Sequence, residues 1–169
     1  MKSMIAARCG GLLALLMAMS VCAEAPAPTA PAPAASAVSP ASTFDPELAA
    51  AVGADEFGMR GYVLVVLKTG PKPMPKGEAR DAMFKGHFAN MNRLTEEKKL
   101  ALAGPFDGVD GWRGLFILAV TDIAEAEKLV ATDPVIASGE MVAEYHKYYG
   151  SAALMLVNEG HAKVARNAM

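Results

Sequence analysis

Apolar residues recur along the chain at two spacings, and each spacing predicts one kind of element. Where they follow one another or alternate over a short run we expect strands, at residues 60–68, 100–106, 112–121 and 140–150. Where they recur every three or four positions we expect helices, at residues 78–94 and 122–133. Segments rich in proline and glycine at residues 70–77 and 107–111 predict a loop and a turn between these elements.

The order strand, helix, strand, strand, helix, strand is typical of a ferredoxin-like βαββαβ α+β sandwich, in which two helices cover one face of an antiparallel sheet. A sheet with one wet face should alternate apolar and polar residues, but residues 62–67 and 115–120 are apolar on both faces. Two helices leave the second face open, and a large exposed apolar surface is a liability. We therefore expect a homodimer, sheet against sheet, that forms a dimeric α+β barrel.

The segments that flank this domain, which we place at residues 59–157, carry weaker signals. Residues 44–58 contain a short helix by prediction, because Asp45 suits an N-cap, Pro46 suits the first helical position and Gly53 suits the stop. Residues 151–157 predict an added edge strand or a segment that packs on a neighbour. We expect residues 158–169 to form a frayed, flexible tail.

The first 23 residues have the pattern of a secretory signal peptide. An apolar run from Gly10 to Val21 follows two basic residues, and the segment ends in Cys22 and Ala23. We expect cleavage after Ala23, a periplasmic or secreted protein, and no stable membrane insertion once the signal is removed, because the run is too short to span a bilayer. The rival interpretation is a lipid anchor on Cys22, although a lipid-acceptor cysteine normally follows a small residue rather than valine.

Residues 24–43 are rich in alanine and proline and lack the large apolar residues that a core needs. Such a composition predicts an extended linker. A passive tail left by export is favoured over a spacer that holds the domain away from a membrane or wall.

Composition narrows the chemistry of the exported chain. Both cysteines, Cys9 and Cys22, lie in the signal segment, so no thiol is left for a disulfide, a nucleophile or a metal site. Without Lys2 and Arg8, 14 basic residues face 18 acidic ones, a net charge of about −4. This balance and the lack of a basic stripe argue against nucleic acid as a partner. No phosphate-binding loop or cofactor fingerprint is present, so we expect no cofactor.

His87 is the residue that raises a functional question. It lies in the middle of the helix expected at residues 78–94, on or beside an apolar stripe that contains Met83, Phe84, Met91 and Leu94. A lone histidine on such a face is usually a packed residue that hydrogen-bonds a carbonyl group. Imidazole also titrates near neutral pH, which suits a general acid or base.

An ordered set of motifs gives the chain a family resemblance. GMRGYVLVVLKTGP, GHFANMNRL, LALAGPF, WRGLFILAV, DPVIASG and YGSAAL follow one another over residues 57–156. This order resembles the YCII-related (YciI-like) domain family, and its exported branch in particular. The resemblance implies a ferredoxin-like fold, a sheet-to-sheet dimer, and a site built from His87 and the aspartate of an Asp-Pro pair, here Asp133. In the family that the chain resembles, most members have no established activity, and a few are described as lyases of small chlorinated ring-cleavage acids.

Asp133 has two compatible interpretations. As a helix N-cap it would start the turn at residues 134–138, with Pro134 at the first position. As a site residue it would orient the ring of His87. One carboxylate oxygen can cap the helix while the other faces the histidine.

Other residues near the expected site are weaker candidates for binding a substrate. Gly104 and Pro105 end a strand, where glycine would let a ligand approach, although a turn explains them equally well. Asp107 is a possible second carboxylate. Arg113 would place a guanidinium where a carboxylate ligand binds, or would simply be solvated at a strand start. Glu144 and His146 share a strand face, but without an evident third ligand they predict no metal site.

Three functions are compatible with these observations. In the first, His87 and Asp133 move a proton on a small organic acid, in a lyase- or isomerase-like reaction without a cofactor. In the second, the same pocket binds a small molecule without turning it over. In the third, the chain is an accessory dimer in which His87 and Asp133 only stabilise helix ends.

Overall fold

The computed structural model describes residues 44–167. The expected signal peptide and the Ala/Pro-rich linker therefore lie outside the described residues. Within this range, no helix combines the length and the apolar composition that a membrane crossing requires.

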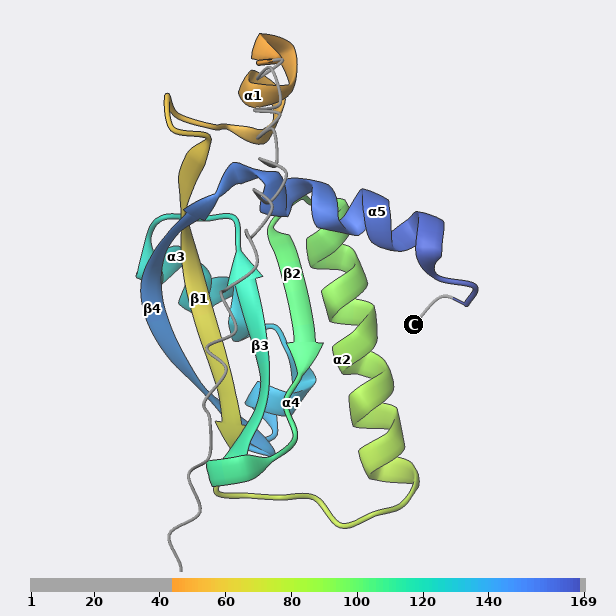
Figure 1. Cartoon of the computed structure of the whole chain (residues 1–169). Coiled ribbons are helices and arrows are strands. Elements are labelled where there is room, and N and C mark those ends of the chain that lie inside the picture. The colour runs from red at the N-terminus through yellow and green to blue at the C-terminus, as the bar shows by residue number, and fades with distance from the viewer. Residues whose placement is uncertain (1–43, 168–169) are drawn as a thin grey trace, which may run out of the picture. The chain divides into compact units, whose positions relative to one another are not determined.

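Four strands form one antiparallel sheet at the predicted places. They are β1 (Met59–Thr69), β2 (Leu100–Pro105), β3 (Trp112–Leu118) and β4 (Met141–Ser151). Their order across the sheet is β2-β3-β1-β4, and every neighbouring pair is antiparallel (Figure 1). With one helix between β1 and β2 and others between β3 and β4, the arrangement fits the expected ferredoxin-like fold.

The helices that follow β1 and β3 cover one face of the sheet (Figure 1). They are α2 (Glu78–Glu96), α3 (Ile123–Val130) and the single turn α4 (Pro134–Ala137). The main core lies between them and the sheet, where every second residue of β1 points inward. Its members include Val63, Val65 and Leu67 of β1, Met83, Met91 and Leu94 of α2, and Val130 and Val135 of α3 and α4.

The opposite face of the sheet is also apolar, as the lack of alternation predicted. A second cluster there contains Tyr62, Ala101 and Ile117, with Leu64, Leu102 and Leu115 partly buried around them. Among the described helices, only the 3₁₀ helix η2 (Ala152–Leu156) contributes to this cluster, through Leu154 and Met155. The consecutive apolar residues in β1 and β3 thus serve two apolar layers, one on each face.

The short N-terminal helix is α1 (Pro46–Val52), with the caps that the sequence indicates. The side chain of Asp45 accepts a hydrogen bond of 2.9 Å from the backbone N–H of Leu48. Gly53 ends the helix at φ 68°, in the left-handed region that favours glycine. These signals are local, and a local pattern was sufficient to place the helix.

The C-terminal expectations need correction. Residues 151–157 add no edge strand of their own, because Ser151 ends β4 and caps η2 by accepting a hydrogen bond of 3.2 Å from the N–H of Ala153. The alternative, that this segment packs on a neighbour, stays a prediction. The segment expected to be a flexible tail begins with the helix α5 (Val157–Val164). Asn158 holds this helix on the sheet by donating a hydrogen bond of 2.8 Å to the carbonyl of Leu100 in β2. A tertiary contact therefore orders a segment whose composition alone looked frayed.

Candidate active site

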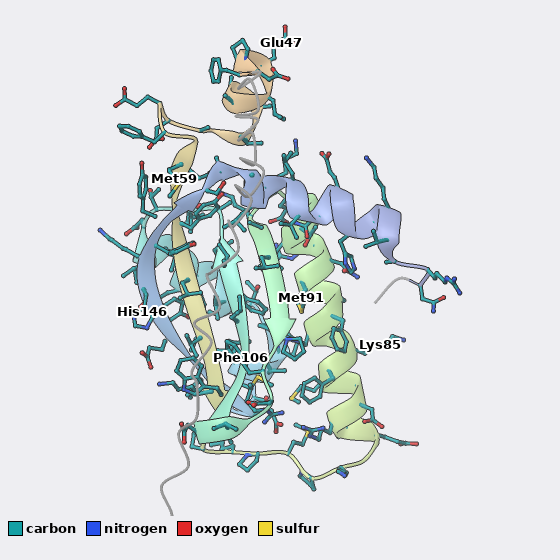
Figure 2. All side chains as sticks on the ribbon, in the orientation of Figure 1. Glu47, Met59, Lys85, Met91, Phe106 and His146 are labelled. Atoms are coloured by element: carbon teal, nitrogen blue, oxygen red, sulfur yellow. The ribbon has the colours of Figure 1, made fainter. Side chains whose placement is uncertain are left out.

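His87 is buried in the middle of α2, on the side that faces the sheet. The whole residue is 8% exposed, and the apolar residues Met83, Met91 and Leu94 lie on the same face of the helix. Figure 2 shows Met91 on the sheet side of α2 and Lys85 on the far side. The stripe read from the sequence therefore does bring a titratable ring into the interior.

The structure brings His87 and Asp133 together. His87 Nδ1 lies 2.7 Å from Asp133 Oδ2 in a fully buried contact. The other oxygen, Oδ1, accepts a hydrogen bond of 3.1 Å from the N–H of Val135 and so caps α4. One carboxylate thus starts a helix and binds the ring at the same time. The hydrogen bond from the backbone N–H of Val135 therefore fixes the position of the carboxylate at the start of α4.

Three phenylalanine rings confine the imidazole of His87. Phe116 of β3 stacks on it at 6.0 Å between centroids, Phe84 meets it edge-on at 6.0 Å, and Phe88 lies at 5.4 Å. This packing fixes the plane of the imidazole ring, while the contact with Asp133 fixes the direction in which Nδ1 points within that plane.

The second nitrogen of the ring remains available. A carboxylate accepts hydrogen bonds, so Nδ1 donates, and a neutral ring then carries no proton on Nε2. Nε2 makes no hydrogen bond to any residue in the range 44–167, nor is it among the buried polar atoms there that lack a partner. The side chain of His87 is 10% exposed. The arrangement therefore holds one nitrogen as a donor and offers the other as a base.

Asn90, one helical turn after His87, ties the same region of α2 to the segment before Asp133. Its Oδ1 accepts a hydrogen bond of 2.8 Å from Arg93, and the same guanidinium donates to the hydroxyl of Thr132 at 3.0 Å. Asn90 Nδ2 is the buried side-chain polar atom of the described residues that has no partner. Thr132 directly precedes Asp133, so these bonds help to fix the position of the carboxylate.

The other residues singled out from the sequence are less closely connected to His87. Gly104 and Pro105 end β2, and a Cβ added at Gly104 would meet no atom within 4 Å, so the position does not require glycine for space. Asp107 accepts a hydrogen bond of 3.1 Å from the N–H of Val109 and is exposed. That bond closes a local turn, which accounts for Asp107 without a ligand.

The guanidinium of Arg113 lies near a buried carboxylate, that of Glu140, which the sequence did not predict as a site residue. The register between β1 and β3 shifts at Leu67 and Lys68, so Arg113 is an extra residue in a β-bulge. Its Nη1 lies 3.7 Å from Oε1 of Glu140, a residue that is 1% exposed. Arg80 of α2 binds the same oxygen at 3.0 Å. The only signal for Glu140 in the sequence was a lone acid directly before the apolar start of β4.

The charge of Glu140 is stabilised despite its burial. Burial works to raise the pKa of its carboxyl group, but hydrogen bonds from the backbone N–H of Met74 and from Arg80, with the positive charges of Arg80 and Arg113, outweigh it. The pKa of Glu140 therefore lies below its ordinary value of 4.5. Two guanidinium groups share this one carboxylate, so the cluster keeps a net positive charge.

This charged cluster and the His87 pair are connected along α2. The guanidinium of Arg80 lies 4.5 Å from the centroid of the Phe84 ring, and Phe84 in turn contacts the ring of His87. Residues spaced by three or four positions share one helix face, so the three side chains follow one another along α2.

Glu144 and His146 do share a strand face, as expected. His146 Nε2 lies 2.9 Å from Glu144 Oε1, and Lys68 also contacts Glu144. Figure 2 shows His146 on β4, away from α2. Within residues 44–167, no three or more His, Cys, Asp and Glu side chains are grouped to hold a metal ion.

Comparison with known proteins identifies the family of the chain. The model of the YCII-related domain matches residues 62–146, half of the chain. The chain belongs to the YCII-related domain family. The matched range includes His87, Asp133 and Glu140, whereas α1, η2 and α5 lie outside it.

The YCII-related domain also has a curated relative. The chain is 35% identical over 54 residues to a protein of Bacillus subtilis (strain 168) named "Uncharacterized protein YjpA". The match covers 32% of this chain and 61% of the relative, so it spans less than two thirds of that protein's length.

Proposed function

We propose that this YCII-related domain catalyses a lyase- or isomerase-like reaction of a small organic acid. It does so by acid–base chemistry and without a cofactor. His87 is the catalytic residue and Asp133 is its positioning residue. The observation that carries the proposal is the buried 2.7 Å contact between His87 Nδ1 and Asp133 Oδ2, which leaves Nε2 without a partner among the described residues.

The chemistry follows from this orientation. Nε2 takes a proton from the carbon next to a carboxylate or carbonyl group, and the electron pair of the C–H bond forms a new C=C bond. In an elimination, a leaving group departs from the neighbouring carbon with its bonding pair. In an isomerisation, the imidazolium returns the proton to a different carbon. General acid–base catalysis contributes about 10²–10⁴ in rate, which suits a substrate that is already activated.

The charged cluster of Arg80, Arg113 and Glu140 supplies an anchor for the carboxylate of such a substrate. Arg113 lies 3.7 Å from Glu140, a distance beyond a hydrogen bond, so as far as residues 44–167 are concerned its donors are available to a ligand. Gly104 and Pro105 border it, since Pro105 pairs with Gly114 in the neighbouring strand. Asp107 has no part in this assignment because it is engaged in its own turn.

We also propose that the protein is exported and forms a homodimer through the second face of the sheet. The cluster around Tyr62 and Ile117 supports the dimer, because it is apolar and the helices α2, α3 and α4 lie on the other face. Sedimentation of the purified protein tests this directly. A dimer is expected at micromolar concentration, and a monomer at every concentration would contradict it.

A non-catalytic small-molecule-binding or accessory module is the second candidate. Restricted access to His87 favours it: the side chain is only 10% exposed, and it lines none of the four hollows described on residues 44–167. In that case the pair with Asp133 would serve to hold α2 against α4.

The substitution His87→Asn separates the two candidates. The asparagine amide keeps an N–H close to the position of Nδ1, so Asp133 retains a donor, while the base Nε2 is removed. The matched control is His146→Asn, which changes the same residue type in the exposed pair. The assay uses NMR to follow the incorporation of solvent deuterium at the carbon next to the carboxylate. A panel of unsaturated and β-substituted acids serves as the substrates.

The catalytic proposal expects exchange with the parent and with His146→Asn, and a rate lower by about 10²-fold or more with His87→Asn. Exchange at the same rate in His87→Asn would rule out His87 as the base. Binding of an acid without exchange in any variant would favour the binding module instead.

A further inference from the structure

The C-terminal helix α5, which lies outside the family match, forms one wall of a cavity. The cavity has a volume of about 400 Å³ and lies between the C-terminal half of α2, the edge strand β2 and α5. Figure 1 shows α5 beside the start of β2 and the end of α2. Small-molecule sites typically have volumes of about 300–1,000 Å³, so the space suits a small ligand.

The lining of this cavity is mixed, with an apolar floor and two basic residues on the side of α5. Met91 of α2 and Leu100 and Leu102 of β2 form the floor, while α5 and the residues after it contribute His161 and Arg166. No aspartate or glutamate lines the cavity among the described residues. The acidic residue of α5, Glu159, lines a different hollow. The charge of this site therefore complements an anion.

The wall is fixed where it meets the sheet. Asn158 donates to the carbonyl of Leu100, a backbone group on the outer strand of the sheet. This bond holds the start of α5 against β2 and places the later residues of the segment over the cavity. The bond also covers part of an edge that would otherwise be open.

We propose that this cavity binds a small organic anion with an apolar body, whose charge is held by Arg166 and His161. The apolar body lies on Met91, Leu100 and Leu102. The site is separate from the chemistry assigned to His87 and does not depend on it: its basic residues come from the segment that follows the family match, and its apolar floor comes from within that match.

Calorimetric titration of the purified protein with benzoate, phenylacetate and octanoate tests the proposal, with the corresponding neutral amides as matched ligands. At least one carboxylate is expected to bind, and to bind more tightly than its amide. Arg166→Gln should weaken this binding about tenfold or more, because it removes a charge-assisted hydrogen bond. Lys163→Gln, a change of charge on α5 outside the cavity lining, should leave it unchanged.

A fourth variant keeps this site distinct from the proposed active site. His87→Asn should bind the carboxylate as the parent does. Loss of binding in His87→Asn with full binding in Arg166→Gln would place the ligand at His87 and overturn the proposal. Equal binding of acid and amide, equal affinity in Arg166→Gln, or binding of none of the three carboxylates would overturn it as well.

Discussion

His87 and His146 each lie within hydrogen-bond distance of a carboxylate, at 2.7 Å from Asp133 and 2.9 Å from Glu144. The two pairs differ in where their members come from. Glu144 and His146 are two residues apart on one strand, so the pair follows from local geometry alone. His87 and Asp133 are 46 residues apart, and only the packing of α2 against α4 brings them together.

The surroundings differ even more. Three phenylalanine rings enclose His87, and Asp133 is fully buried. His146 and Glu144 are about half exposed, and Lys68 binds the other oxygen of the same carboxylate. A short distance is therefore not what marks a site. What distinguishes the buried pair is that a backbone N–H, that of Val135, holds the second carboxylate oxygen and that aromatic rings enclose the imidazole, which gives the ring one orientation.

The largest effect is expected from breaking the buried pair. Asp133→Ala removes the cap of α4, worth about 1 kcal/mol, and leaves a buried ring nitrogen unpaired, which costs about 1–3 kcal/mol more. Urea unfolding at neutral pH should show a total loss of about 2–4 kcal/mol. Asp133→Asn keeps an oxygen for one of the two bonds and should lose less. An unchanged unfolding midpoint for Asp133→Ala would contradict the assigned contacts.

Glu140 offers an intermediate case, a buried carboxylate whose partners are arginines instead of histidine. Glu140→Gln should lower the free energy of unfolding by about 1–3 kcal/mol at neutral pH, because the bonds to Arg80 lose their charge assistance.

The pH dependence of this effect has a definite sign. Since the pKa of Glu140 is lower in the folded chain, the folded state binds fewer protons, and the stabilisation is complete above pH 4.5 and is lost as the pH falls towards the folded-state pKa. The difference between parent and Glu140→Gln should therefore shrink below pH 4.5. A difference that grows on acidification would be contrary to this assignment.

The smallest effect belongs to the exposed pair. The hydrogen bond from Lys68, followed by that from His146, lowers the pKa of Glu144, yet solvent and salt screen these contacts. Glu144→Gln should unfold at the same urea concentration as the parent, with and without added salt. A clear destabilisation that disappears in high salt would show that the exposed pair matters after all.

The same contrast explains what the sequence could predict. The caps Asp45 and Gly53 act on residues beside them, so α1 was readable from a local pattern. Glu140 was missed because its partners, Met74, Arg80 and Arg113, come from three separate segments. The contact of His87 with Asp133 was expected from the family resemblance, since periodicity shows that a residue faces inward but not what it meets there.

The C-terminal correction has the same cause. Residues 157–164 have little helical signal of their own, and Gly160 in the middle disfavours a helix. The bond from Asn158 to Leu100 joins residues far apart in the sequence, so it could not be read from the segment itself.

The central claim is that Asp133 holds His87 as a single tautomer with an unprotonated Nε2. Long-range ¹H–¹⁵N correlation spectra of the histidine rings, recorded where the rings are neutral, test it most directly, with His146 as the reference in the same sample. The account predicts that His87 carries its proton on Nδ1 alone in the parent, while the exposed His146 averages between tautomers. A proton on Nε2 of His87, or averaging like that of His146, would contradict it.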